Sequence, residues 1–133
     1  KPSFHPDAAA RSIRELARHR DNMLRSASKE VQHMQKSLVL MNIKVDTVIS
    51  DILGKSGKAI IEAILNGNHD PKSLVQLVDP RCKASKETIE KSLEGTWDAV
   101  HLFELKQSYD LYKYIHTQIA DCEAEMDRLL GES

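Results

Sequence analysis

A row of basic side chains is the feature of this sequence with the clearest chemical meaning. Its members recur at spacings of three, four, seven and four residues, which places them on one flank of a helix. They are Arg11, Arg14, Arg18, Arg25 and Lys29. Such a stripe suits contact with the phosphates of DNA or RNA, because guanidinium groups bind phosphate through two parallel hydrogen bonds. The alternative is a solvated charged flank, paired with the neighbouring Glu15, Asp21 and Glu30.

The segment Gly54-Lys55-Ser56-Gly57 is similar to the end of a phosphate-binding loop. That loop also requires a glycine five residues before Gly54, where this chain has Ile49, and it follows a strand. A second interpretation is a helix-hairpin-helix, whose more closely spaced glycines let main-chain N–H groups approach a DNA phosphate. The spacing favours the third, a plain turn between two helices.

The sequence predicts no set of side chains that would bind a metal or catalyse a reaction. None of the six histidines lies three or four residues from another histidine or a cysteine, and His116 falls on a helical seam. Acidic residues gather near the end of the chain, where we expect a solvated face; they are Asp121, Glu123, Glu125 and Asp127. Cys82 and Cys122 lack CxxC spacing and are expected to be reduced thiols. We therefore predict that this chain has no catalytic, cofactor-binding or metal-binding residue and is not itself an enzyme.

The net charge of −1 conceals a division along the chain. Residues 1–58 hold 11 Lys+Arg and 6 Asp+Glu, a net charge of +5. Residues 59–133 hold 8 Lys+Arg and 14 Asp+Glu, a net charge of −6. Either the two halves attract each other or the basic half faces a polyanion. No apolar run approaches the ~20 residues of a membrane span, so we expect no membrane partner. The two thiols suit a reducing cytoplasm, which is the location that we expect, and we expect no small-molecule substrate.

The elements that carry these residues are predicted to be helices. Hydrophobic residues make up 41% of the chain and aromatic residues only 5%, a mixture typical of helices. Over residues 7–45 a seam recurs at alternating steps of four and three, with Arg20 its only polar member. The seam consists of Ile13, Ala17, Arg20, Leu24, Ala27, Val31, Met34, Leu38, Met41 and Val45. This heptad pattern predicts a long helix that needs a partner helix along its length.

Residues 46–95 predict a cluster of short helices. An apolar face over 48–53 predicts the first, and a more apolar run over 59–65 predicts the second. Asp70 and Ser85 are the predicted N-caps of two more helices.

A second long helix is predicted over residues 96–130, capped by Thr96. Its seam consists of Leu102, Leu105, Tyr109, Tyr112, His116, Ile119, Glu123, Met126 and Leu130. A second apolar line widens the face and consists of Leu111, Ile115, Cys122 and Leu129. The predicted fold is therefore all-α, a single domain over 1–133 in which two long heptad-patterned helices pack antiparallel with the short helices between them. The expected contacts of the helix seam and of an oligomer are Leu24, Val31, Met34, Leu38, Met41, Leu105, Tyr109, Tyr112, Ile119 and Met126.

An ordered series of short runs, covering nearly the whole chain, resembles the middle region of one family. The runs are Ser3-Phe4-His5-Pro6-Asp7, Arg18-His19-Arg20-Asp21, 31–38, Met41-Asn42, 48–54, 59–61, 67–71, 79–82, 93–97, 101–107 and 109–112. The family is that of bacterial insertion-sequence transposases with a RuvC-like N-terminal domain and a serine-bearing C-terminal domain, understood as bridge-RNA-guided DNA recombinases. No single run is diagnostic, and the series as a whole carries the resemblance.

The resemblance implies a supporting role for this chain. In such enzymes four acidic residues of the N-terminal domain hold Mg²⁺ and a serine of the C-terminal domain is the nucleophile, so no catalytic residue is carried over here. The middle segment links the two catalytic domains, and its coiled coil helps to assemble the oligomer. We therefore expect a piece of a longer bacterial transposase, forming a dimer and meeting DNA and guide RNA through its parent. The alternatives are a free-standing helical scaffold and a helical module that binds nucleic acid by itself.

Overall fold

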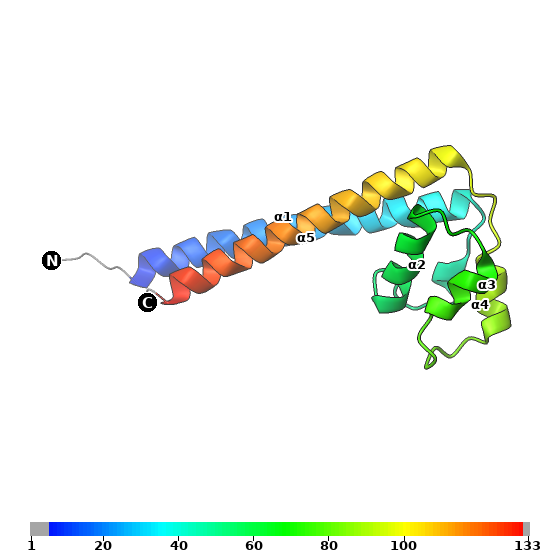
Figure 1. Ribbon diagram of the computed structural model, residues 1–133. Coiled ribbons are helices and arrows are strands. Elements are labelled where there is room, and N and C mark those ends of the chain that lie inside the picture. Colours follow the sequence, from blue (N-terminus) through cyan, green and yellow to red (C-terminus); the bar gives the residue numbers. More distant parts are fainter. Residues whose placement is uncertain (1–5, 132–133) are drawn as a thin grey trace. The chain divides into compact units, whose positions relative to one another are not determined.

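The computed structural model describes residues 6–131, and within them it confirms the all-α prediction (Figure 1). The α-helices are α1 (Pro6–Leu40), α2 (Lys55–Leu65), α3 (Pro71–Leu74), α4 (Lys86–Ser92) and α5 (Ala99–Gly131), with 3₁₀ turns at Val45–Thr47 and Val75–Leu77. The first residues that carry the resemblance, Ser3, Phe4 and His5, lie outside the described residues, as do Glu132 and Ser133. None of the described helices is long and apolar enough to cross a membrane.

Helix α1 ends five residues before the predicted boundary at residue 45. Asn42 adopts a left-handed conformation with φ 59°, and the N–H of Ile43 donates to the carbonyl of Leu38 at 2.9 Å. Asparagine tolerates this conformation, which satisfies carbonyl groups of the last helical turn. Val45 therefore lies in the 3₁₀ turn rather than in α1, although its side chain is buried as predicted.

The helix expected over 48–53 is wrong. Residues 48–54 form turns and bends, and Asp51 Oδ1 accepts a hydrogen bond from the N–H of Leu53 at 3.0 Å. Ile49 and Ile52 are nevertheless buried. Their apolar character reported burial correctly, but four apolar residues in six do not distinguish a helix from a packed turn.

The other short helices follow their predicted signals. Helix α2 buries Ile60, Ile61 and Ile64, and its run is the most apolar of the cluster. The side chain of Asp70 accepts from the N–H of Lys72 to cap α3, and that of Ser85 accepts from the N–H of Thr88 to cap α4. Both caps satisfy N–H groups that have no partner within the helix.

Helix α5 begins at Ala99, three residues after the predicted cap. The N–H of Thr96 donates to the carbonyl of Met41 at 2.9 Å, and Trp97 adopts a left-handed conformation with φ 56°. Thr96 is therefore occupied in joining the segment after α1 to the segment before α5. The prediction missed this because a threonine before a heptad pattern reads as a cap unless its tertiary partner is known.

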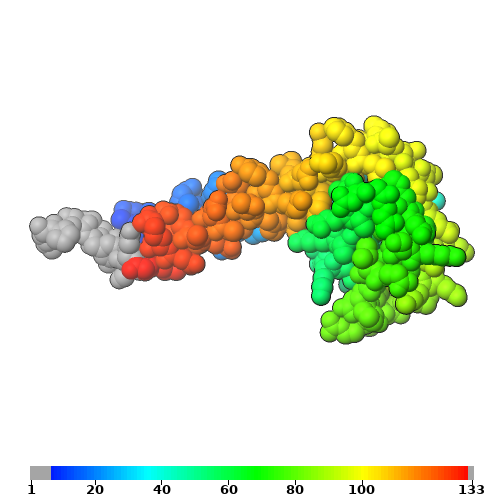
Figure 2. Space-filling model, in the orientation of Figure 1, coloured from blue at the N-terminus to red at the C-terminus, as the bar shows by residue number. Residues whose placement is uncertain are grey.

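The chain divides into two compact units, and α1 and α5 each contribute to both. Unit 2 comprises residues 31–108 and contains the short helices. Figure 2 shows the green residues of α2 and α3 massed with the yellow start of α5. The core of unit 2 is formed by Met34, Leu38, Met41, Ile43, Val45, Ile49, Ile52, Ile60, Ile61, Ile64, Leu74, Val75, Ile89, Leu93 and Leu105.

Unit 1 comprises residues up to 30 together with those from 109 onward, so it consists of the first part of α1 and the last part of α5. These two helical segments pack on each other, and the thiol of Cys122 donates to the carbonyl of Leu16 at 3.4 Å. The hydrophobic residues that unit 1 buries among those described are Ala27, Tyr109, Ile119 and Cys122. This core is far smaller than that of unit 2.

Candidate helix-pairing surface and nucleic-acid interface

Four of the predicted seam residues meet in the core of unit 2. Met34, Leu38 and Met41 of α1 are fully buried, and so is Leu105 of α5. Val31, at the edge of this unit, is half-buried. These side chains pack within unit 2, so they cannot contact another molecule unless this unit opens.

The seam of α1 in unit 1 is rotated from the predicted line. Leu24 is 41% exposed, whereas its neighbour Met23 is half-buried. A straight α-helix has 3.6 residues per turn and drifts by about 20° per heptad relative to a strict seven-residue repeat. The drift brings Leu16 and Met23 into the covered stripe beside the seam residue Ala27, which is buried as predicted, and leaves Leu24 at the edge.

The seam of α5 shifts in the same way from His116 onward. His116, Glu123 and Leu130 are exposed, and they are replaced by the second apolar line. In that line Cys122 is buried and Ile115 and Leu129 are half-buried. Of the remaining predicted contacts, Tyr109 and Ile119 are buried, and Tyr112 and Met126 are half-buried. From Ile115 onward the helix covers the second apolar line, because burying His116 and Glu123 would require partners for both polar groups, whereas the first member of that line, Leu111, is 46% exposed.

An ion pair between α1 and α5 marks one side of unit 1. Arg20 Nη1 lies 3.7 Å from Glu123 Oε2, with side chains 33% and 53% exposed. Arg20 Nε is buried and has no hydrogen-bond partner within the described residues. A long, partly exposed ion pair contributes little stability, while an unpaired buried N–H is unfavourable by about 1–3 kcal/mol. This pair is therefore not an optimised contact of the isolated chain.

All five residues of the basic stripe are exposed on the unit 1 part of α1. Arg18 Nη1 donates to Glu15 Oε1 at 3.1 Å, and Arg25 donates to the side chain of Asn22. No carboxylate of residues 6–131 forms an ion pair with Arg11, Arg14 or Lys29. The stripe thus keeps cationic groups that a phosphate could reach, and Glu15, one of the predicted neutralising acids, binds Arg18.

The acidic residues of α5 are exposed as predicted. Glu125 forms hydrogen bonds with Arg128, at 2.9 Å from Nε and 2.6 Å from Nη2. These bonds lower the pKa of the Glu125 carboxyl below its ordinary value. Within unit 1, residues 6–30 carry six basic and four acidic side chains, and residues 109–131 carry two and five. The two helical segments of this unit therefore have opposite net charges, +2 and −3.

The predicted turn at Gly54–Gly57 is instead the start of α2, with Gly54 at the N-cap position and Lys55, Ser56 and Gly57 in the first helical turn. A Cβ atom on Gly57 would lie 2.0 Å from the carbonyl oxygen of Ile52, so no larger residue fits there. Ser56 Oγ accepts a hydrogen bond from the N–H of Asp79 at 2.9 Å. Local packing at the start of α2 thus accounts for both the glycine and the serine.

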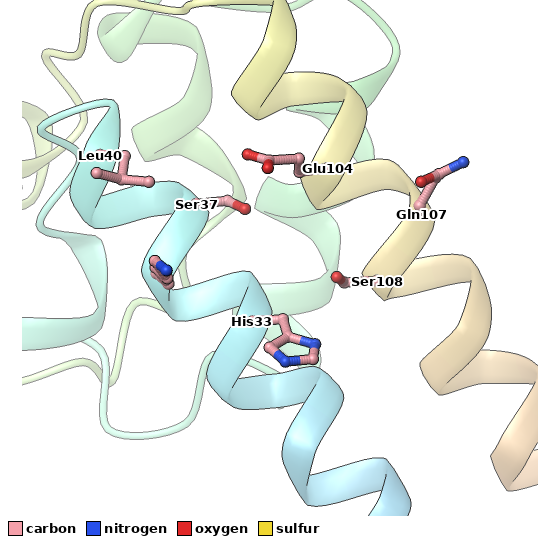
Figure 3. Close-up of a pocket in the computed structure, with 7 residues that line it drawn as sticks. His33, Ser37, Leu40, Glu104, Gln107 and Ser108 are labelled. Atoms are coloured by element: carbon pink, nitrogen blue, oxygen red, sulfur yellow. The ribbon is translucent and has the colours of Figure 1, made fainter.

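A polar cleft of about 310 Å³ in unit 2 was not predicted (Figure 3). It is lined by His33, Lys36, Ser37 and Leu40 of α1 and by Glu104, Gln107 and Ser108 of α5. Figure 3 shows the Glu104 carboxylate pointing away from His33. The Glu104 carboxylate pairs with His101 Nδ1 at 2.8 Å.

An aromatic stack was also missed by the sequence analysis. The rings of His69 and Trp97 are stacked, with centroids 4.4 Å apart and planes within 4° of parallel. The stack joins the loop after α2 to the segment before α5. Trp97 is the chain's only tryptophan, so a packing role for it could have been predicted from the sequence. Nothing in the residue spacing indicated that His69 is its partner.

In the part of the chain that the structure describes, no three His, Cys, Asp or Glu residues gather as a metal site would require. Comparison of the chain with protein-family models, with curated proteins and with solved structures finds no match.

Proposed function

We infer that this chain is the helical linker and oligomerisation domain of a DNA transposase of the bacterial insertion-sequence family that its sequence resembles. The parent enzyme would cut and join DNA with Mg²⁺ and a serine in its other domains, guided by RNA in the bacterial cytoplasm. This chain would hold those domains together and contribute no catalytic residue. The alternative is a helical scaffold with no nucleic-acid role.

An antiparallel pairing of α1 and α5 is part of this proposal. In unit 2 the carbonyl of Met41, just after α1, accepts from the N–H of Thr96, just before α5. In unit 1 the carbonyl of Leu16, near the start of α1, accepts from the thiol of Cys122, near the end of α5. Each contact joins an early part of one helix to a late part of the other, which supports opposite directions.

The observation that carries the oligomerisation proposal is the thin core of unit 1. Within residues 6–30 and 109–131, these two helical segments bury only four hydrophobic residues, so they have little packing to stabilise them, whereas helices in proteins depend mainly on such packing. Leu24 and Leu130 remain 41% and 55% exposed in the same unit. A partner helix would cover these side chains and complete the core.

Sedimentation equilibrium of the 133-residue chain tests this function. We expect a dimer at tens of micromolar protein. A chain that stays monomeric throughout this range would contradict the oligomerisation role and favour the scaffold. Reading the gene on both sides of the segment tests the parent: acidic motifs upstream and a serine motif downstream are expected.

A second candidate function, nucleic-acid binding, rests on the exposed basic stripe. Arg14→Glu with Arg18→Glu should weaken binding of the chain to duplex DNA and reduce the salt dependence of log affinity by roughly 0.9 per lost phosphate contact. The matched control is Lys86→Glu with Lys91→Glu, which reverses two exposed cations of α4. Equal affinity and salt dependence in the two double variants would identify the stripe as a solvated flank.

A further inference from the structure

The polar cleft of unit 2 lies beside the buried seam residues of α1 and α5. All of the residues that line it fall within 31–108, so it belongs to one compact unit. On α1, Ser37 directly precedes the buried Leu38, and on α5, Glu104 directly precedes the buried Leu105. Each helix therefore contributes polar side chains to the cleft from residues that flank its apolar seam.

Ser37 has a buried side chain that the rest of the chain does not satisfy. It is only 4% exposed, yet its Oγ forms no hydrogen bond with any residue in 6–131. Ser26, in the same helix, donates to the carbonyl of Asn22 at 3.2 Å. Ser92, which is also buried, donates to the carbonyl of Ile89 at 2.6 Å. Buried polar groups almost always have a partner, so the Ser37 hydroxyl is suited to bond a molecule that enters the cleft.

The other polar side chains of the cleft are rich in hydrogen-bond donors. Figure 3 shows the hydroxyls of Ser37 and Ser108 directed into the space between α1 and α5. Lys36, also in the lining, forms no ion pair with a carboxylate of the described residues. Glu104 is the one carboxylate of the lining, and its Oε1 pairs with His101 Nδ1 at 2.8 Å. The cleft thus offers two hydroxyls and an ammonium group to a ligand that accepts hydrogen bonds.

We propose that this cleft binds the terminal phosphate of a small phosphorylated molecule. Ser37 and Ser108 donate to phosphate oxygens, and Lys36 supplies a positive charge, a common role of lysine toward phosphate. A phosphate monoester has three terminal oxygens, which match these three donor groups, whereas a carboxylate has two. The inference goes beyond the linker and oligomerisation role, which requires no ligand.

The size and depth of the cleft favour a terminal phosphate over the backbone of DNA or RNA. Its volume of about 310 Å³ lies at the lower end of the roughly 300–1,000 Å³ of small-molecule pockets. A backbone phosphodiester carries a sugar on both sides and has two free oxygens, so it is poorly suited to reach a hydroxyl as buried as that of Ser37. The basic stripe lies in unit 1 and contributes no residue to this cleft.

NMR titration of the ¹⁵N-labelled full chain tests the proposal with three probes at constant ionic strength. They are methyl phosphate, which is a monoester, dimethyl phosphate, which is the diester unit of a nucleic-acid backbone, and acetate. At about pH 8 the monoester is a dianion. We expect methyl phosphate to shift the amide resonances of Ser37 and Ser108 saturably, and the two monoanions to bind at least about fivefold more weakly.

The probes also give the results that would overturn the proposal. The absence of saturable shifts at Ser37 and Ser108 would do so, as would shifts confined to the basic stripe. Equal affinity for dimethyl phosphate would identify a site for a nucleic-acid backbone instead. Equal affinity for acetate would identify a general anion site without the proposed preference for phosphate.

Substitutions of the donors locate the site, each with a matched control. Ser37→Ala should weaken methyl phosphate binding by about tenfold, as expected for one hydrogen bond to a charged group. Ser92→Ala, at the buried serine that has its own partner, should leave the affinity within about twofold. The amide spectrum of each variant establishes that it is folded.

The lysine provides an independent test if Ser37→Ala does not fold. Lys36→Gln, at an exposed position, should weaken binding by about fivefold or more, because it removes the positive charge. Lys58→Gln removes an exposed cation of α2 outside the cleft and should leave the affinity unchanged. Unchanged affinity in either Ser37→Ala or Lys36→Gln would overturn the proposal.

Discussion

At the scale of single residues, Asp79 is the most strongly perturbed acid. Its carboxylate accepts from the Arg81 side chain, at 3.2 Å from Nε and 3.0 Å from Nη2, and from the Arg81 N–H at 2.8 Å. The side-chain hydrogen bonds, followed by the backbone bond, lower the pKa of Asp79 from 3.8 to about 2. Because the folded pKa is the lower one, the ionised carboxylate stabilises the fold above pH 3.8, and this contribution is lost as the pH falls to about 2.

We expect Arg81→Gln to move the Asp79 pKa upward, toward 3.8. The measurement is a carboxyl ¹³C NMR titration of the folded chain between pH 1.5 and pH 6, a range of about four units around both values. Lys83→Gln is the control, since it removes an exposed cation close in sequence. An Asp79 pKa that stays near 2 in the Arg81 variant would show that this side chain is not the cause.

The stack of His69 on Trp97 should contribute measurably to the stability of unit 2. We expect His69→Ala to lower the free energy of unfolding by about 0.5–1.5 kcal/mol beyond the change from lost area, as aromatic pairs do. Urea unfolding followed by circular dichroism gives the value. His19→Ala, at an exposed position on α1, should change it by less than about 0.5 kcal/mol.

At the scale of elements, Gly57 determines how closely α2 approaches the turn before it. Alanine favours a helix over glycine by about 1 kcal/mol, yet its Cβ would meet the Ile52 carbonyl oxygen at 2.0 Å. We expect Gly57→Ala to destabilise the chain by about 1–3 kcal/mol, because backbone must move. Gly131→Ala, where nothing lies within 4 Å, is the control and should not destabilise. A neutral Gly57 variant would show that α2 shifts freely.

The helical elements were predictable because their signals are local. Heptad spacing indicated both long helices, and Asp70 and Ser85 marked two N-termini correctly. The end of α1 was not predictable, because Asn42 stops the helix without the glycine or proline that usually signals it. The start of α5 depends on the long-range bond of Thr96 to Met41, which no local pattern contains.

The candidate surfaces were predictable only in part. The exposure of Arg11, Arg14, Arg18, Arg25 and Lys29 followed from their shared flank. The sequence could not predict which of two adjacent apolar lines α5 buries. Over the length of this helix, a straight helix and a supercoiled helix bury different lines. The sequence therefore predicted the pairing face of each helix to within about one residue. Which of the adjacent apolar residues is buried depends on how the two helices pack.

At the scale of the whole molecule, the two units differ in how much apolar surface they bury. Unit 1 depends on a core of four hydrophobic residues, and unit 2 has a much larger one. We expect backbone amides of α1 in residues 16–27 to exchange with deuterium faster than those of α2 in residues 59–64 at sub-micromolar protein. Raising the protein concentration should slow exchange in residues 16–27, because a second copy would cover them. Equal protection of both segments at low concentration would contradict the difference in core size.

The distribution of aromatic residues gives each unit its own optical signal. The sole tryptophan, Trp97, belongs to unit 2, and all three tyrosines, Tyr109, Tyr112 and Tyr114, belong to unit 1. Excitation at about 295 nm selects the indole, and the ring ¹H NMR resonances of the tyrosines report the phenol rings without a contribution from the indole. Melting of the two units can therefore be followed separately in one unlabelled sample, and a thermal scan would reveal whether they unfold together.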